Sequence, residues 1–178
     1  VMETKTVLVT GGGRGIGKAI AVKLASKGAT VVINYNGSRE RAEEVKNEVE
    51  SAGGKAVIIQ CNVADFDACK EFIETVIKEQ GRIDILVNNA GITKDGLLMG
   101  MSESDFDSVI DVNLKGTFNM MRFVSRQMLR QRCGRIISMA SVVGIAGNAG
   151  QANYAASKAG IIGMTKSCLL YTSDAADD

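Results

Sequence analysis

The sequence predicts an α/β fold, in which a doubly wound parallel sheet lies between helices as in a Rossmann fold. Short apolar stretches rich in Val and Ile alternate with longer amphipathic stretches along the chain. Uninterrupted apolar strands are typical of parallel sheets, because such strands are buried on both faces. A glycine-rich run, TGGGRGIGK, follows the first apolar stretch, where folds of this kind bind phosphate. Together these features predict right-handed βαβ units.

Each predicted element rests on its hydrophobic period and on the residues at its ends. Stretches rich in Val and Ile predict strands at residues 5–10, 30–34, 56–60, 83–88 and 135–139. Amphipathic stretches predict helices at residues 16–27, 39–51, 66–80 and 154–169, with one or two more over 102–131. Gly53 and Gly81 mark two helix ends, and Ser102 and Asp105 are candidate N-caps.

The composition is that of an ordinary globular protein and argues against several functions. Hydrophobic residues make up 46% and charged residues 23% of the chain, and the net charge is +1. A nucleic-acid-binding protein would carry a basic surplus, and no apolar run is long enough to span a bilayer. We therefore expect no nucleic-acid partner and no membrane association. No signal peptide precedes the first strand, so a cytoplasmic location is expected.

Two residue types restrict the chemistry further. The chain contains no His, which excludes catalytic schemes built on His and metal sites with His ligands, and we expect no metal. Its four Cys, at positions 61, 69, 133 and 168, form no CxxC pair. We expect them to be free, buried thiols, as in a reducing compartment.

The glycine-rich run can be compared with two phosphate-binding motifs. Gly12, Gly17 and Lys18 have the spacing of a P-loop, but Ala19 stands where that motif needs a hydroxyl for Mg²⁺. The strict GxGxxG spacing is also absent. The run does fit Thr-Gly-x3-Gly-x-Gly, in which glycines allow a sharp turn, close approach to a pyrophosphate and tight helix packing. It therefore favours a dinucleotide over a triphosphate.

The end of the second predicted strand bears on the choice of dinucleotide. An NAD site places Asp or Glu there, whereas this strand ends Asn34-Tyr35-Asn36. Arg14 lies in the glycine-rich run and Arg39 follows the strand, and such cations suit the 2′-phosphate of NADP(H). For Arg39, a solvated helix charge is an equally good interpretation.

Further polar residues follow the later strands. Asn88–Gly91 (NNAG) and Ser141 each come after a predicted strand, at the sheet edge where ligands bind. Tyr154 and Lys158 are four residues apart, which places them on one face of a helix. A nearby ammonium stabilises a phenolate and lowers the pKa of a tyrosine from about 10. The pair could therefore move a proton, although the YxxxK pattern alone is common by chance.

In order and spacing, TGGGRGIG, NNAG, the Asn113 of DVNLKG, Ser141 and YAASK resemble the motifs of the short-chain dehydrogenase/reductase family. The resemblance implies a catalytic tetrad. Tyr154 would donate a proton to the substrate carbonyl, and Ser141 would polarise that carbonyl. Lys158 would bind the nicotinamide ribose and lower the pKa of Tyr154. Asn113 would hold a water that relays protons between Lys158 and solvent.

The resemblance also implies a set of cofactor-binding residues for NADP(H), with Asn62 and Val63 near the adenine. The full set is Gly11, Gly13, Arg14, Gly15, Ile16, Gly17, Asn62, Val63, Asn89, Ala90, Gly91, Tyr154 and Lys158. Many family members carry Asp where Asn62 stands, and Asn can still accept a hydrogen bond there.

Within the family, the stretches NNAGITKDGLLMGMS and GRIISMASVVGIAGNAGQANYAASKAGIIG resemble the reductases of β-ketoacyl thioesters on acyl-carrier protein. This resemblance implies a homotetramer, with Arg132 and Gln151 as contacts for the acidic carrier protein. Arg122, Arg126 and Arg130 form a stripe on one helix face that could steer the acidic carrier protein. A solvated face or a subunit interface explains this stripe at least as well. Two other functions stay open: another short-chain reductase, acting on acetoacetyl-CoA, a sugar or another ketone, or a non-catalytic nucleotide-binding regulator on the same fold.

The end of the chain departs from this pattern. The resemblance extends to about Ser167 and covers the front two-thirds of the usual length of the family, without its last two strands. Cys168–Asp178 resembles the translation of a sequencing adapter, and sequencing the gene past codon 167 would test this. We expect residues 1–167 to form one partial NADP-binding domain, residues 168–178 to be a non-native tail, and the chain as written to be inactive.

Overall fold

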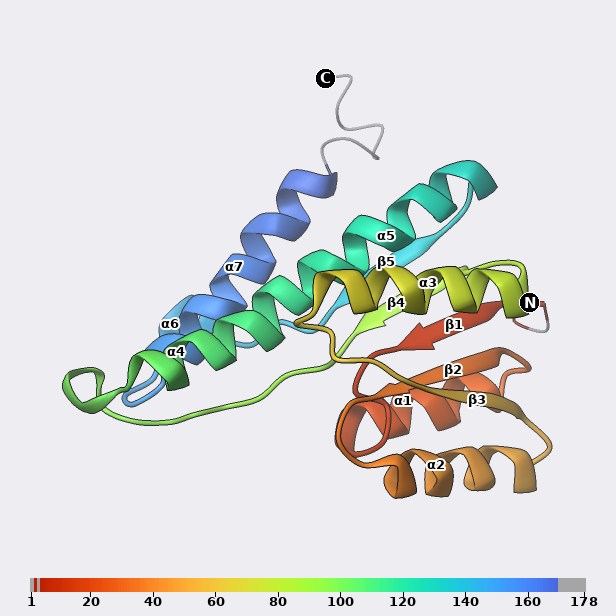
Figure 1. Ribbon diagram of the computed structural model, residues 1–178, viewed down its shortest axis with the longest axis horizontal. Coiled ribbons are helices and arrows are strands. Elements are labelled where there is room, and N and C mark those ends of the chain that lie inside the picture. The colour runs from red at the N-terminus through yellow and green to blue at the C-terminus, as the bar shows by residue number, and fades with distance from the viewer. Residues whose placement is uncertain (1, 3, 170–178) are drawn as a thin grey trace.

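The computed structural model describes Met2 and residues 4–169, so the predicted tail beyond Leu169 lies outside the described residues. The strands form one parallel sheet in the order β3-β2-β1-β4-β5 (Figure 1). This order confirms the predicted doubly wound fold, because the chain reverses direction across the sheet between β1 and β4. The strands are β1 (Thr6–Val9), β2 (Thr30–Tyr35), β3 (Lys55–Gln60), β4 (Ile85–Asn88) and β5 (Arg135–Ser138).

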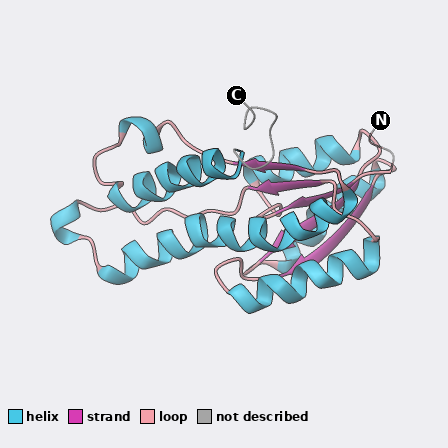
Figure 2. Ribbon diagram, turned by 90° about the horizontal axis from the view of Figure 1, so that it is seen from above, coloured by secondary structure: helices cyan, strands magenta, loops and turns pink. Residues whose placement is uncertain are grey.

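Helices cover both faces of the sheet (Figure 2). Their bounds are α1 (Gly15–Ala25), α2 (Arg39–Ser51), α3 (Phe66–Gln80), α4 (Glu103–Val109), α5 (Gly116–Gln131), α6 (Val143–Ala146) and α7 (Ala152–Leu169). Alternate residues of β1 show why two layers form: Leu8 packs with α3 and α5, whereas Val7 and Val9 pack with α1 and α2. Successive side chains of a strand point to opposite faces, so one apolar strand supplies both cores.

The long helical stretch differs from its prediction in detail. Between α4 and α5 the chain forms a π-helical segment, η2 (Ile110–Lys115), so residues 103–131 are helical throughout. The 3₁₀ turn η1 (Leu98–Gly100) and the short α6 were not predicted, because neither is long enough to show a hydrophobic period. Ser102 caps α4 and Gly81 ends α3 in the left-handed conformation, as predicted.

The prediction that all four Cys are buried was wrong: Cys61 and Cys69 are buried, but Cys133 and Cys168 are exposed, because they lie in a turn and at the end of α7. Helix α7 continues past Ser167 to Leu169, and the proposed domain boundary there stays a prediction. Among Met2 and residues 4–169, no helix has the length and apolar character needed to cross a membrane.

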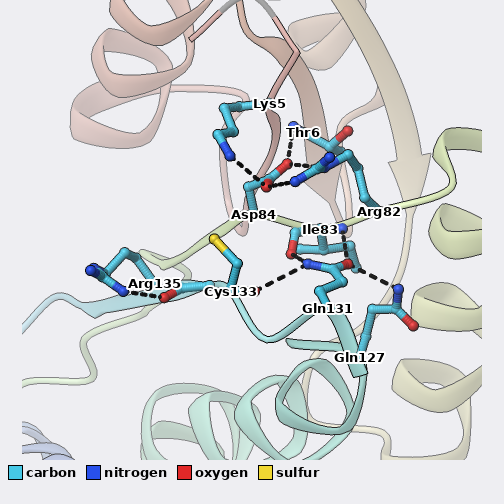
Figure 3. Close-up of polar contacts among 10 residues, drawn as sticks. Lys5, Thr6, Arg82, Ile83, Asp84, Gln127, Gln131, Cys133 and Arg135 are labelled. Carbon is cyan, nitrogen blue, oxygen red and sulfur yellow. Dashed lines mark hydrogen bonds and ion pairs between the residues drawn. The ribbon is translucent and has the colours of Figure 1, made fainter. Parts of the chain in front are cut away.

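A buried carboxylate joins the amino ends of the central strands (Figure 3). Asp84 is 3% exposed and accepts hydrogen bonds from the Thr6 amide at 2.9 Å, Lys5 Nζ at 3.2 Å and Arg82 Nε at 2.7 Å. Its carbonyl accepts from the Arg135 amide at 2.9 Å, so one residue connects β1, β4 and β5. Burial by itself raises the pKa of Asp84, but these hydrogen bonds outweigh it and hold the pKa below its ordinary value.

Replacing this carboxylate should destabilise the sheet. We expect Asp84→Asn to lower the free energy of unfolding by about 1–3 kcal/mol at pH 7, since charge-assisted bonds to Lys5 and Arg82 are lost. Because the folded-state pKa is depressed, this contribution is present above the unfolded-state value of about 3.9 and is lost as the pH falls through the folded-state value.

Urea unfolding at pH 7 and in stepwise acid would measure the difference. Asp107→Asn is the matched control, since Asp107 is exposed and makes no side-chain hydrogen bond or ion pair within the described part of the chain. A stability loss in Asp84→Asn that persists unchanged in acid would contradict the assignment.

Candidate active site

The glycine-rich run connects β1 to α1 and turns at two glycines. Gly11 and Gly15 have φ of +62° and +54°, which favour glycine, and α1 begins at Gly15. The amide of Gly11 donates to Asn34 Oδ1 at 3.3 Å, and that of Gly12 donates to the Asn34 carbonyl at 3.1 Å. Asn34, considered in the sequence only for its missing charge, is a buried residue that fixes the turn to β2.

Asn89, in the segment after β4, holds the same turn from the other side. Its Nδ2 donates to the carbonyls of Thr10 at 3.0 Å and Gly11 at 3.1 Å, while Thr10 Oγ1 accepts from the amides of Asn89 and Ala90, both at 3.0 Å. A Cβ at Gly17 would lie 2.4 Å from Asn89 Nδ2. Gly17 is therefore required because the asparagine packs against the first turn of α1.

Arg14 and Ile16 of the turn face solvent, whereas Gly13 faces α2. Arg14 precedes α1 in an extended conformation and, among the described residues, its guanidinium makes no hydrogen bond or ion pair. Ile16 is 63% exposed, although it is a large apolar residue. Gly13 packs against α2, where an added Cβ would lie 3.5 Å from the Ala42 amide. Arg39, the second candidate for a phosphate, instead pairs with Glu43 at 2.8 Å.

Tyr154 and Lys158 lie one turn apart on α7, as predicted. Lys158 Nζ is 5.6 Å from the centroid of the Tyr154 ring and donates to the Met139 carbonyl at 2.6 Å. The side chain is buried, with the residue 5% exposed, and this burial lowers the pKa of Lys158 below its ordinary value. The carbonyl that follows β5 thus fixes the ammonium beside the phenol.

One cleft of about 290 Å³ joins the glycine turn to this pair. It brings together residues from the turns after β1, β4 and β5 and from α7, because the carboxyl ends of parallel strands share one edge of the sheet. Its lining consists of Arg14, Ile16, Asn89, Gly91, Ile92, Thr93, Met139, Ala140, Tyr154 and Lys158. A cation, a helix N-terminus and a phenol–ammonium pair therefore face one space.

Asn113 lies beneath the cleft rather than in its lining, on the π-helical segment η2. Its Oδ1 accepts from the Ile92 amide at 2.8 Å, and its Nδ2 donates to the Ile92 carbonyl at 3.0 Å and Ser157 Oγ at 3.2 Å. Asn113 thus connects the segment after β4 with the residue that precedes Lys158. Isolated π turns are frequent at functional sites, because they redirect side chains.

The predicted site residues Ser141, Asn62 and Val63 do not line the cleft. Ser141 follows Ala140, and its Oγ accepts from the Val143 amide at 3.2 Å. Asn62 and Val63 come after β3, at the same edge of the sheet but beyond β2. Asn62 Oδ1 accepts from the Ala64 amide at 3.1 Å, which shapes the turn.

The two predicted docking residues lie far apart. Arg132 ends α5 with a left-handed φ of 51° and precedes β5, whereas the cleft follows that strand. A strand of this length spans about 13 Å, so Arg132 lies at the opposite end of the strands from the cleft. Gln151 lies three residues before Tyr154, and its Nε2 donates to Asp95 at 3.1 Å.

Several residues that hold the site were missed by sequence reasoning. Thr10, Asn34, Met139 and Ser157 act through buried side chains or a main-chain carbonyl, and none belongs to a charged or periodic pattern. Thr10 and Ser157 lie within the TGGGRGIG and YAASK motifs, and Asn34 lies at a strand end, which could have suggested a role for each.

Known proteins share this arrangement. A model of the family described as short chain dehydrogenase matches residues 5–173. The 3-oxoacyl-acyl-carrier-protein reductase FabG of Staphylococcus aureus is 56% identical over 164 residues, covering 92% of this chain and 67% of that protein. The corresponding reductase of Thermotoga maritima is 52% identical over 165 residues, with coverage of 93% and 67%.

Solved structures agree with the sequence relatives. The crystal structure of a metagenomic short-chain oxidoreductase in complex with NADP superposes with a TM-score of 0.90 at 38% identity, covering 94% of this chain and 76% of that one. Residues of the glycine turn, the segment after β4 and the Tyr154–Lys158 pair line one cleft, and the family match spans nearly the whole chain. The chain belongs to the short-chain dehydrogenase family.

Proposed function

We propose that this protein reduces the β-keto group of an acyl thioester on acyl-carrier protein to a β-hydroxyl, using NADPH. The observation that carries the proposal is the single cleft that joins the glycine turn to Tyr154 and Lys158. The relatives that are 50–56% identical are named as 3-oxoacyl-acyl-carrier-protein reductases, which supports the substrate class. The solved neighbour with NADP supports the cofactor.

The described residues fit an NADP(H) molecule. A Cβ at Gly15 would meet no atom within 4 Å, so the start of α1 is open to a pyrophosphate, which the helix N-terminus would stabilise. The guanidinium of Arg14, which makes no hydrogen bond or ion pair with the described residues, would hold the 2′-phosphate, and no acidic residue stands at the end of β2 to oppose it. When bound there, the cofactor supplies the hydride for carbonyl reduction.

The proton comes from the protein. Tyr154 donates its phenolic proton to the carbonyl oxygen as the hydride arrives, and Ser141 donates a hydrogen bond to the same oxygen. Lys158 lies beside the Tyr154 ring in a poorly solvated position, where its charge stabilises the phenolate more than it would in water. Asn113 orients α7 through Ser157, and the predicted water relay from Lys158 would begin near this contact.

The structure gives less support to a different ketone substrate or to a regulatory role. A nucleotide-binding regulator needs the glycine turn, but it has no use for a buried ammonium fixed beside a phenol that opens into the same cleft. Acetoacetyl-CoA, a sugar or another ketone would use the same chemistry, so substrate choice depends on contacts with the carrier.

The proposal extends to the oligomeric state and the cellular location of the protein. We infer a cytoplasmic homotetramer, as the family resemblance implies. The outer face of α5 exposes Phe118 and Leu129, which is what a subunit interface on this helix would need. Arg132 would contact the carrier protein at a distance from the cleft of its own chain. Gln151 would contact the carrier protein nearer to Tyr154.

The activity is tested with the product of the complete gene, by following NADPH oxidation with acetoacetyl-acyl-carrier protein and with acetoacetyl-CoA. We expect a higher kcat/KM for the carrier-bound substrate. Tyr154→Phe should bind NADPH as the unmodified chain does and lose at least about a hundredfold in kcat, because general acid catalysis contributes about that much. Turnover that survives in Tyr154→Phe would remove this residue from the proton-donor role.

The docking role of Arg132 is tested by charge reversal. Arg132→Glu should raise the KM for the carrier-bound substrate about tenfold, through repulsion of an acidic partner, and leave a small ketoester unaffected. Lys70→Glu, an equal charge reversal at an exposed position of α3, serves as the control. An equal rise in KM for both substrates in Arg132→Glu would contradict the docking role.

A further inference from the structure

The turn after β3 is held by a buried side chain of α5. Asn119 Nδ2 donates to the carbonyl of Val63 at 2.8 Å, and the same carbonyl accepts from Cys69 Sγ at 3.3 Å. Gly116, one turn earlier on α5, packs directly on Val63, where an added Cβ would lie 2.7 Å from Val63 Cγ2. Asn119 and Gly116 therefore both fix the position of Val63 in this turn.

Asn119 is an unexpected residue for its position. It is 0% exposed in the layer between α3 and α5, which is otherwise built from apolar side chains such as Phe72, Met120 and Val124. Its Oδ1 is buried without a hydrogen-bond partner in the described part of the chain. Burial of an unsatisfied amide oxygen costs free energy, so an apolar residue here would give a more stable core. Within the described residues, the hydrogen bond to the Val63 carbonyl is the one that this side chain makes.

The position of Val63 indicates what the bond is for. The catalytic cleft lies over β1, β4 and β5, and the glycine turn at α1 lies next to it. A dinucleotide with its nicotinamide in the cleft and its pyrophosphate at Gly15 must extend its other half over β2 and β3. The turn of Asn62 and Val63 follows β3 at this edge, where the adenine would lie.

We propose that Asn119 is a positioning residue that fixes the Asn62–Val63 turn for the adenosine half of the cofactor; this inference rests on the proposed function. The same helical stretch carries Asn113, whose amide holds Ile92 beside the catalytic cleft. One stretch of helix, η2 followed by α5, thus holds the turns at both ends of the cofactor through two buried asparagines.

The test uses the two halves of the cofactor as separate probes. Adenosine 2′,5′-bisphosphate represents the adenosine half and nicotinamide mononucleotide the other half. Calorimetry gives the Kd of each for the product of the complete gene. Asn119→Leu, which is close to isosteric, should raise the Kd for adenosine 2′,5′-bisphosphate about tenfold, as the loss of one hydrogen bond would. The Kd for nicotinamide mononucleotide should change less than about twofold.

Two further variants separate positioning from general damage. Gly116→Ala should weaken the adenosine probe in the same way, because it displaces Val63 while leaving a residue that favours helix. Met120→Leu alters the neighbouring core residue but keeps both the Asn119 amide and Gly116, and should change neither Kd. If Asn119→Leu fails to fold, the result for Gly116→Ala decides.

Unchanged affinity for the adenosine probe in the folded variants, or an equal loss for both probes, would overturn the positioning role. If the unmodified product of the complete gene binds neither probe, the proposed cofactor and this inference are overturned together. Binding of both probes without reduction of a β-ketoacyl thioester would overturn only the proposed reaction.

Discussion

The amide of Asn89 is the contact on which the site depends. Its two hydrogen bonds to the carbonyls of Thr10 and Gly11 join the turn after β1 to the segment after β4, across the point where the sheet order reverses. Gly17 leaves the space for this side chain, so the first turn of α1 can lie directly beside it. The open helix start and the wall of the cleft are therefore positioned by one residue.

Other buried polar groups extend this scheme to the rest of the strand ends. Asn34 fixes the glycine turn to β2, Asn113 fixes the segment after β4 to α7, and the Met139 carbonyl fixes Lys158. Each group is a hydrogen-bonded amide or ammonium with little access to water, where such bonds specify geometry strongly. At the opposite end of the sheet, Asp84 fixes the starts of the strands in the same way. The carboxyl ends of the strands, where the cleft lies, can therefore stay open.

The fold was largely predictable from sequence, because apolar strands and amphipathic helices alternate with clear punctuation. The bounds of α2 and α3 agree with prediction, and the pairing of Tyr154 with Lys158 followed from helical spacing. The π-helical segment was not predictable, since the hydrophobic pattern there fits an α-helix equally well. The supporting residues Thr10, Asn34 and Asn119 were missed because their partners are backbone groups distant in sequence, which no local pattern reveals.

The central claim is that one cleft orients NADP(H) between the glycine turn and the Tyr154–Lys158 pair. A crystal structure of the protein soaked with NADP⁺ tests it most directly. The account predicts the pyrophosphate at the start of α1, the 2′-phosphate on Arg14, and the nicotinamide between Gly91 and Tyr154. A nucleotide bound in the reverse direction, or outside this cleft, would contradict it.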